Sequence, residues 1–101
     1  MAAEFLKKHG LEILDRNYCI RGGEIDIIAR DRDYLVFVEV KFRSTSLSGT
    51  SAEAIDGKKA SRIRHAAAVY LYTRGYPETT PCRFDAVAID RDRITWVKDA
   101  F

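Results

Sequence analysis

Three charged residues interrupt two apolar stretches of the sequence. Asp26 lies within residues 24–30, whereas Glu39 and Lys41 lie within residues 34–43. Because side chains alternate between the two faces of a strand, Glu39 and Lys41 share one face. Charged groups in such apolar surroundings are costly unless they are paired, lie at an edge or bind an ion. The spacing therefore predicts a site where two carboxylates meet a lysine.

The chemistry that these residue types favour is metal-assisted hydrolysis of a phosphodiester. Two neighbouring carboxylates repel each other, and magnesium or manganese relieves that repulsion. Magnesium commonly takes one or two carboxylates and keeps several waters. Asp26 and Glu39 supply such ligands, and the carbonyl oxygen of Val40 can add a third. Lys41 then lies beside the ion, where its charge can orient a water or stabilise a phosphorane-like transition state.

Two further acids are candidates for the same site. Glu24 shares the strand face of Asp26, and Glu53 lies in the segment before a basic helix. Either can hold a second ion or a water, and either can equally be a solvated surface residue. A Glu-x-Lys pair such as Glu39 and Lys41 is also common at sheet edges as a weak ion pair. A purely structural role for the charged residues therefore stays open.

Basic residues outnumber acidic ones around the main predicted helix. The chain carries a formal net charge of only +2. Between residues 41 and 74 the acids are Glu53 and Asp56, and the basic residues are Lys41, Arg43, Lys58, Lys59, Arg62, Arg64 and Arg74. A local basic surface can attract a polyanion without a high overall charge. We expect Arg43, Lys58, Lys59 and Arg62 to bind a nucleic-acid backbone, although an ordinary solvated helix face is the alternative.

Hydrophobic periodicity predicts the elements that must position these residues. The expected helices cover residues 2–9, ended by Gly10, and residues 58–74, with a short helical turn at 51–55. The expected strands cover residues 12–18, 24–30, 34–43, 82–89 and 94–97. The polar turn at residues 31–33 predicts an antiparallel hairpin, and the long helix predicts a parallel strand–helix–strand unit. The fold class is therefore α/β, a mixed sheet flanked by helices in the order α-β-β-β-α-β-β.

The inward face of the long helix follows from the same periodicity. Its predicted apolar stripe consists of Ile63, Ala67, Tyr70 and Leu71. Lys58 and Arg62 belong to the opposite, outward stripe.

Length and composition limit the organisation of the chain. With 101 residues, 47 % of them hydrophobic, residues 1–101 are expected to form one domain. No apolar run approaches the roughly 20 residues needed to span a membrane. The charged N-terminal segment lacks the apolar centre of a signal peptide, so a cytoplasmic location is expected.

Four blocks of the sequence carry a resemblance to a known family. They are GGEIDIIAR at residues 22–30, LVFVEVK at 35–41, SAEAI at 51–55 and RFDAVA at 83–88. Together they resemble the YraN family, also named UPF0102, over nearly the whole chain. That family is similar to Holliday-junction resolvases and restriction endonucleases of the PD-(D/E)xK superfamily. The resemblance implies a restriction-endonuclease-like three-layer core with Asp26, Glu39 and Lys41 as motif residues, DNA as the partner, and a homodimer.

Three functional hypotheses follow. The first is a Mg²⁺- or Mn²⁺-dependent endonuclease acting on DNA, including branched or flapped DNA. The second is a nucleic-acid-binding module with a degenerate site, because Ala60 stands where the family usually carries glutamine and the first helix begins after the usual Gly-Glu pair. The third is an interaction domain in which the charged residues only fix strand register.

Overall fold

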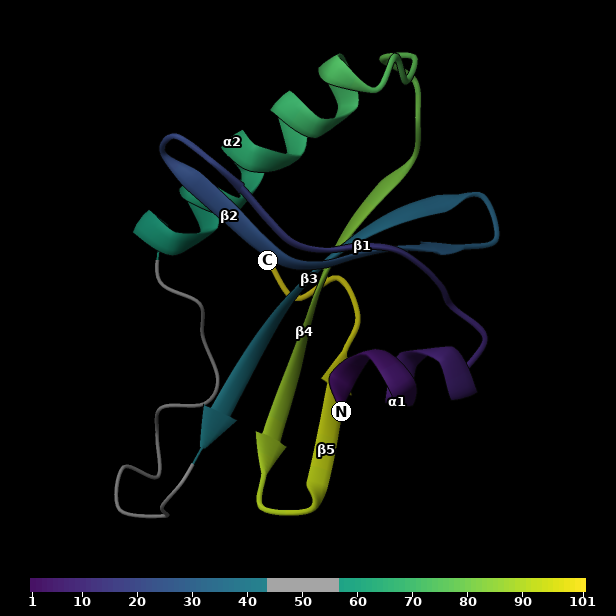
Figure 1. Cartoon of the computed structure of the whole chain (residues 1–101), viewed down its shortest axis with the longest axis vertical. Coiled ribbons are helices and arrows are strands. Elements are labelled where there is room, and N and C mark those ends of the chain that lie inside the picture. Colours follow the sequence, from purple (N-terminus) through teal and green to yellow (C-terminus); the bar gives the residue numbers. More distant parts are fainter. Residues whose placement is uncertain (44–56) are drawn as a thin grey trace.

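The computed structural model describes residues 1–43 and 57–101 (Figure 1). The elements along the chain are α1 (Ala2–Lys8), β1 (Glu12–Ile20), β2 (Gly23–Asp31), β3 (Tyr34–Arg43), α2 (Gly57–Thr73), β4 (Cys82–Asp90) and β5 (Arg93–Val97). The predicted order of elements is confirmed. Glu53, the side chain of Arg43 and the helical turn expected at residues 51–55 lie outside the described residues.

The five strands form one mixed sheet in the order β1-β2-β3-β4-β5. The central strand β3 pairs antiparallel with β2 and parallel with β4, and the two outer pairs are antiparallel. A tight turn joins β2 to β3, with Arg32 in the left-handed conformation at φ 59°. The predicted hairpin and the parallel pair joined through α2 are both confirmed.

Alternate residues of β3 pack against the two different helices. Leu35 and Phe37 belong to the apolar cluster that includes α2, whereas Val36 and Val38 belong to the cluster that includes α1. All four side chains are buried, and each contributes about 1.5–3 kcal/mol to folding. The sheet therefore separates α1 from α2, as Figure 1 shows, and the arrangement is the predicted three-layer core.

The helix α2 packs on the sheet through Ile63, Ala66, Ala67 and Tyr70. These residues follow the spacing i, i+3, i+4, i+7 of one helix face. The predicted stripe omitted the buried Ala66, and its fourth predicted member, Leu71, packs against the same cluster at its margin. Leu71 is only half-buried, since its position eight residues after Ile63 lies at the edge of the stripe. Neither helix of the described chain is long and apolar enough to cross a membrane.

Gly23 allows the start of β2 to approach α2 closely. A Cβ atom at residue 23 would lie 2.4 Å from the carbonyl oxygen of Arg62 and 3.2 Å from the Cβ atom of Ala66. The first of these is a backbone atom, which has little freedom to move away. The absence of a side chain at Gly23 thus fixes the first half of α2 over the beginning of β2.

The strand β1 continues beyond its predicted end at residue 18, because its last residues pair with the start of β2. Within this hairpin Asn17 has a φ of 52°, a left-handed conformation that asparagine tolerates better than most residues. Asn17 lies across from Asp26, since the flanking residues of the two strands are paired. The backbone irregularity therefore falls beside the predicted site.

Candidate functional site

Asp26 and Glu39 lie on the adjacent strands β2 and β3, just beyond the point where the ladder between these strands ends. The last ladder pair before them is Ile27–Val38, so the next residue on each strand carries a carboxylate. A side-chain contact continues the pairing, because the backbone N–H of Val40 donates to Oδ2 of Asp26 at 2.8 Å. The hairpin register thus brings the two carboxylates together, as the short turn predicted.

Glu39 is one of two buried charged residues in the described part of the chain. Only 2 % of its surface is exposed. Burial raises the pKa of the Glu39 carboxyl above its usual value; Lys59 opposes this rise, and the neighbouring Asp26 adds to it. An enclosed carboxylate beside a second carboxylate favours any positive charge that can reach it.

In the structure, an ammonium group from α2 supplies positive charge to this site. Lys59 forms an ion pair with Oε2 of Glu39, and 44 % of the lysine side chain is exposed. Hydrogen bonding to Glu39 raises the pKa of Lys59, and the charges of Asp26 and Glu24 act in the same direction. Three carboxylates, two on β2 and one on β3, therefore act on one ammonium group.

A hollow of about 260 Å³ opens beside Asp26. Its lining consists of Met1, Ala2, Ala3, Arg16, Asn17, Asp26, Ile27, Val40 and Phe42. Asp26 is half-buried at its wall, and Phe42 is 75 % exposed at the end of β3. The carboxylate pair is therefore reached from solvent through Asp26, whereas Glu39 is enclosed.

The donor set fits a hard divalent cation that retains water. No group of three or more His, Cys, Asp or Glu side chains within residues 1–43 and 57–101 is arranged to share an ion. The groups that could donate to such an ion are the carboxylates of Asp26 and Glu39 and the backbone carbonyl of Val40. In a strand the N–H and C=O of one residue point toward the same neighbouring strand. The N–H of Val40 points toward β2, where it contacts Asp26, so the Val40 carbonyl also points toward β2. Two carboxylates and a carbonyl leave positions for water, as magnesium commonly requires.

Comparison with known proteins identifies the family of the chain. The model of the uncharacterised protein family UPF0102 matches residues 1–89. The chain belongs to the UPF0102 family. It is 49 % identical over 100 residues to a UPF0102 protein of Lachnoclostridium phytofermentans, which covers 99 % of this chain and 85 % of that protein.

Two further UPF0102 relatives are similar over a comparable length. A protein of Idiomarina loihiensis is 47 % identical over 104 residues, covering 100 % of this chain and 90 % of the relative. A protein of Colwellia psychrerythraea is 42 % identical over 105 residues, covering 99 % and 81 % respectively. The family resemblance of the sequence is therefore confirmed, and the matched names specify no reaction.

The other predicted site residues of this UPF0102 member lie on β2, β3 and α2. Lys41 is half-buried two residues after Glu39, on the same face of β3 by strand alternation. Lys58 and Arg62 are exposed on α2, and Glu24 is exposed at the start of β2. Their roles in catalysis and binding stay predictions.

Sequence reasoning missed the contact between Lys59 and Glu39, because it assigned Lys59 to the nucleic-acid backbone. A signal was present in the spacing. Lys59 lies four residues before Ile63, the first buried residue of α2, and therefore on the helix face that meets the sheet. Its neighbour Lys58 is exposed.

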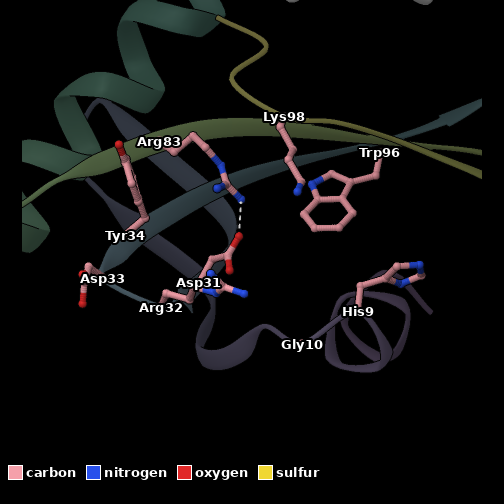
Figure 2. A pocket seen from close by; sticks show the side chains of 9 residues that line it. All are labelled: His9, Gly10, Asp31, Arg32, Asp33, Tyr34, Arg83, Trp96 and Lys98. Carbon is pink, nitrogen blue, oxygen red and sulfur yellow. Dashed lines mark hydrogen bonds and ion pairs between the residues drawn. The ribbon is translucent and has the colours of Figure 1, made fainter.

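Asp85 is the other buried charged residue of the described chain, with no exposed surface. Arg83 donates to both of its oxygens, at 2.9 Å from Nε and 3.0 Å from Nη2. The indole N–H of Trp96 and the backbone N–H of Asp99 donate to it at 2.9 Å each. Arg83 also donates to Asp31 at 3.0 Å, the interaction drawn in Figure 2. Asp85 is therefore paired with an arginine and has its hydrogen bonds supplied by β4, β5 and the chain after β5.

A larger hollow of about 650 Å³ lies at the other end of the β2–β3 hairpin (Figure 2). Its lining consists of His9, Gly10, Asp31, Arg32, Asp33, Tyr34, Arg83, Trp96 and Lys98. Asp31 follows Asp26 by five residues of β2, roughly 16 Å at about 3.3 Å per residue. Figure 2 shows acidic and basic side chains facing one another, with Arg83 already paired to Asp31. Because acidic and basic side chains are mixed in its lining, this hollow is a weaker candidate for a cation site than the carboxylate pair.

Proposed function

We propose that this protein is a Mg²⁺- or Mn²⁺-dependent endonuclease that hydrolyses DNA phosphodiester bonds, including those of branched or flapped DNA. The observation that carries the proposal is the Asp26–Glu39 pair. Two carboxylates lie side by side at the end of the central hairpin, one of them enclosed, with Lys41 on the same strand. The resemblance to PD-(D/E)xK nucleases points to the same three residues.

The residues that would hold the ion are Asp26 and Glu39, with the carbonyl oxygen of Val40 as a third ligand. A bound divalent ion supplies Lewis acidity and lowers the pKa of a coordinated water. The chain itself supplies the position of the two carboxylates. The carboxylate of Asp26 is held by a hydrogen bond of 2.8 Å from the backbone N–H of Val40. Enclosure of Glu39 limits competition from bulk water for its oxygens.

Basic side chains supply the remaining parts of the proposed mechanism. Lys41 lies two residues after Glu39, and its compact ammonium charge would stabilise negative charge that develops on the phosphate. Lys58 and Arg62 are exposed on α2 and would contact the DNA backbone. Arg43 is assigned to the same surface from the sequence alone. Cutting both strands of a duplex requires two such sites, which is the reason for expecting a homodimer.

A second candidate is a nucleic-acid-binding module whose nuclease site is degenerate. The observation that favours it is the ion pair of Lys59 with Glu39, because an ammonium group already offsets the charge of that carboxylate. Ala60, which follows Lys59, lacks the polar group that the family resemblance leads one to expect. In this case the basic surface of α2 would bind DNA without hydrolysis.

Cleavage of a labelled DNA panel tests the first candidate. The panel contains single-stranded, duplex, flapped and four-way DNA, each incubated with Mg²⁺, Mn²⁺ or EDTA. We expect divalent-dependent cleavage by the wild type, and a loss of about 10²-fold or more in Lys41→Ala. Lys7→Ala, which changes an exposed lysine of α1, is the matched control and should cleave like the wild type. Absence of cleavage of every substrate by the folded wild type would contradict the proposal.

Binding of the same DNA in EDTA separates the two candidates. Each lost phosphate contact should reduce the slope of log affinity against log salt by about 0.9 for duplex DNA. Lys58→Ala and Arg62→Ala should each show such a reduction. Salt-dependent binding without cleavage in Mn²⁺ selects the second candidate, and binding that ignores salt contradicts both.

A further inference from the structure

The packing of α2 on the sheet sets the position of the Lys59 backbone, and the ion pair with Glu39 follows from that position. The missing side chain of Gly23 allows the backbone of α2 to lie close to β2 at Arg62. Ile63, one helical turn after Lys59, is buried between α2 and the sheet. Lys59 lies one turn before this packed segment, and its ammonium group contacts the enclosed carboxylate of Glu39.

An ion that takes Glu39 as a ligand must approach the carboxylate that Lys59 already contacts. Two cations at one carboxylate repel each other strongly when the surroundings are of low dielectric. Only 3 % of the Glu39 side chain is exposed, so this side chain cannot turn out into water unless the residues around it move. Lys59 has a flexible four-carbon stem and 44 % of its side chain is exposed, so it can turn outward into water. Of the two partners, the lysine is therefore the one that moves.

We propose that Lys59 is the resident counter-cation of Glu39, and that a divalent ion enters the site by displacing it. This inference rests on the metal site of the proposed function. It explains how an enclosed carboxylate beside Asp26 is tolerated before the ion arrives. It also gives Lys59 two successive partners, Glu39 first and a phosphate of the DNA second.

Displacement of Lys59 couples the binding of the ion to the binding of DNA. Arg62 is exposed one turn further along α2, and Lys58 is exposed beside Lys59. A freed Lys59 would join these two residues and add a third positive charge to the same surface. Because coupling between two binding events is reciprocal, DNA that engages Lys59 should raise the affinity for the ion.

Calorimetric titration of Mn²⁺ into the DNA-free protein at pH 8 tests the inference. Lys59→Met removes the ammonium group and keeps a side chain of similar length, and Lys59→Gln is a second neutral variant. We expect both to bind Mn²⁺ about three- to tenfold more tightly than the wild type. Lys59→Arg, which keeps the charge, and Lys7→Met, which removes an exposed charge of α1, should stay within about twofold of the wild type. Thermal unfolding of each variant verifies the fold.

The outcomes separate this inference from the proposed function. Mn²⁺ binding by the wild type with equal or weaker binding by Lys59→Met and Lys59→Gln would overturn the displacement of Lys59 and leave the metal site standing. No Mn²⁺ binding by any variant would overturn the metal site and the displacement together. Tighter binding by the neutral variants, with Lys59→Arg unchanged, is the result that the inference requires.

Discussion

Glu39 and Asp85 are the two buried charged residues of the described chain, and they are held in opposite ways. They lie on the adjacent strands β3 and β4, on opposite faces of the sheet. Asp85 accepts four hydrogen bonds from donors that are fixed in place. Glu39 instead contacts a long lysine side chain and lies beside a second carboxylate, and burial raises its pKa.

The difference separates a structural acid from a candidate functional one. A buried charge stabilises a fold when its hydrogen bonds are complete, and it is costly when they are not. Asp85 ties β4 to β5 through Trp96 and to the chain after β5 through Asp99. Among the described residues, Glu39 connects β3 to α2 through the partly exposed Lys59, and its burial next to Asp26 is the observation on which the proposed ion site rests.

The largest expected effect on stability belongs to Asp85→Asn. The substitution breaks the paired contact with Arg83, which is itself largely buried, and should lower the free energy of unfolding by about 3 kcal/mol. Urea unfolding at pH 7 measures it. Asp31→Asn is the matched control, because it removes the outer partner of the same arginine and should cost about 1 kcal/mol or less. If both variants lowered the free energy of unfolding equally, the buried Asp85 would matter to the fold no more than the partly exposed Asp31.

A smaller loss is expected for Gly23→Ala, which tests how firmly α2 presents Lys59 to Glu39. The added methyl group would press on the carbonyl oxygen of Arg62 and should cost about 2 kcal/mol. Gly57→Ala is the control, since a Cβ at the first residue of α2 meets nothing within 4 Å. The control should be neutral or slightly stabilising. If Gly23→Ala were as stable as the wild type, α2 could move away from β2 at little cost, and the close approach at Gly23 would not position Lys59.

The smallest effect, and one of opposite sign, is expected for Glu39→Gln in the metal-free protein. The folded state holds the Glu39 proton more tightly than the unfolded state, because the pKa is raised on folding. The stability contribution of Glu39 is therefore present below its unfolded-state pKa and is lost as the pH rises through the folded-state pKa. Glu39→Gln should be more stable than the wild type at pH 8, by up to about 1 kcal/mol.

Thermal unfolding in EDTA from pH 4 to pH 8 measures this prediction. The advantage of Glu39→Gln should grow as the pH rises and should disappear in acid. Asp85→Asn serves as the contrast, because it should be less stable than the wild type at pH 8. If Glu39→Gln were instead less stable than the wild type at pH 8, as Asp85→Asn is expected to be, both carboxylates would stabilise the fold and the contrast between them would be wrong.

The sequence predicted the elements because they depend on local information. The short turn at residues 31–33 and the two-residue alternation made a meeting of Asp26 and Glu39 plausible, but the register itself comes from the structure. The family resemblance added the three-layer arrangement. The boundary of β1 was less accurate, because its last residues are strands only through pairing with β2.

Contacts that depend on the placement of α2 or β5 were beyond the sequence. The ion pair of Lys59 with Glu39 requires the exact height of α2 over the sheet, which the close contact at Gly23 sets. The hydrogen bond from Trp96 to Asp85 requires β5 to lie beside β4 in one register. The contact of Val40 with Asp26 depends on where the β2–β3 ladder ends. None of these follows from periodicity or composition.

A crystal structure of the protein soaked with Mn²⁺, with anomalous data collected, tests the central claim most directly. The account predicts an anomalous peak in contact with the carboxylates of Asp26 and Glu39, with the Lys59 side chain turned away from Glu39. A protein saturated with Mn²⁺ in which Lys59 still contacts Glu39 and no peak lies between the two carboxylates would contradict it.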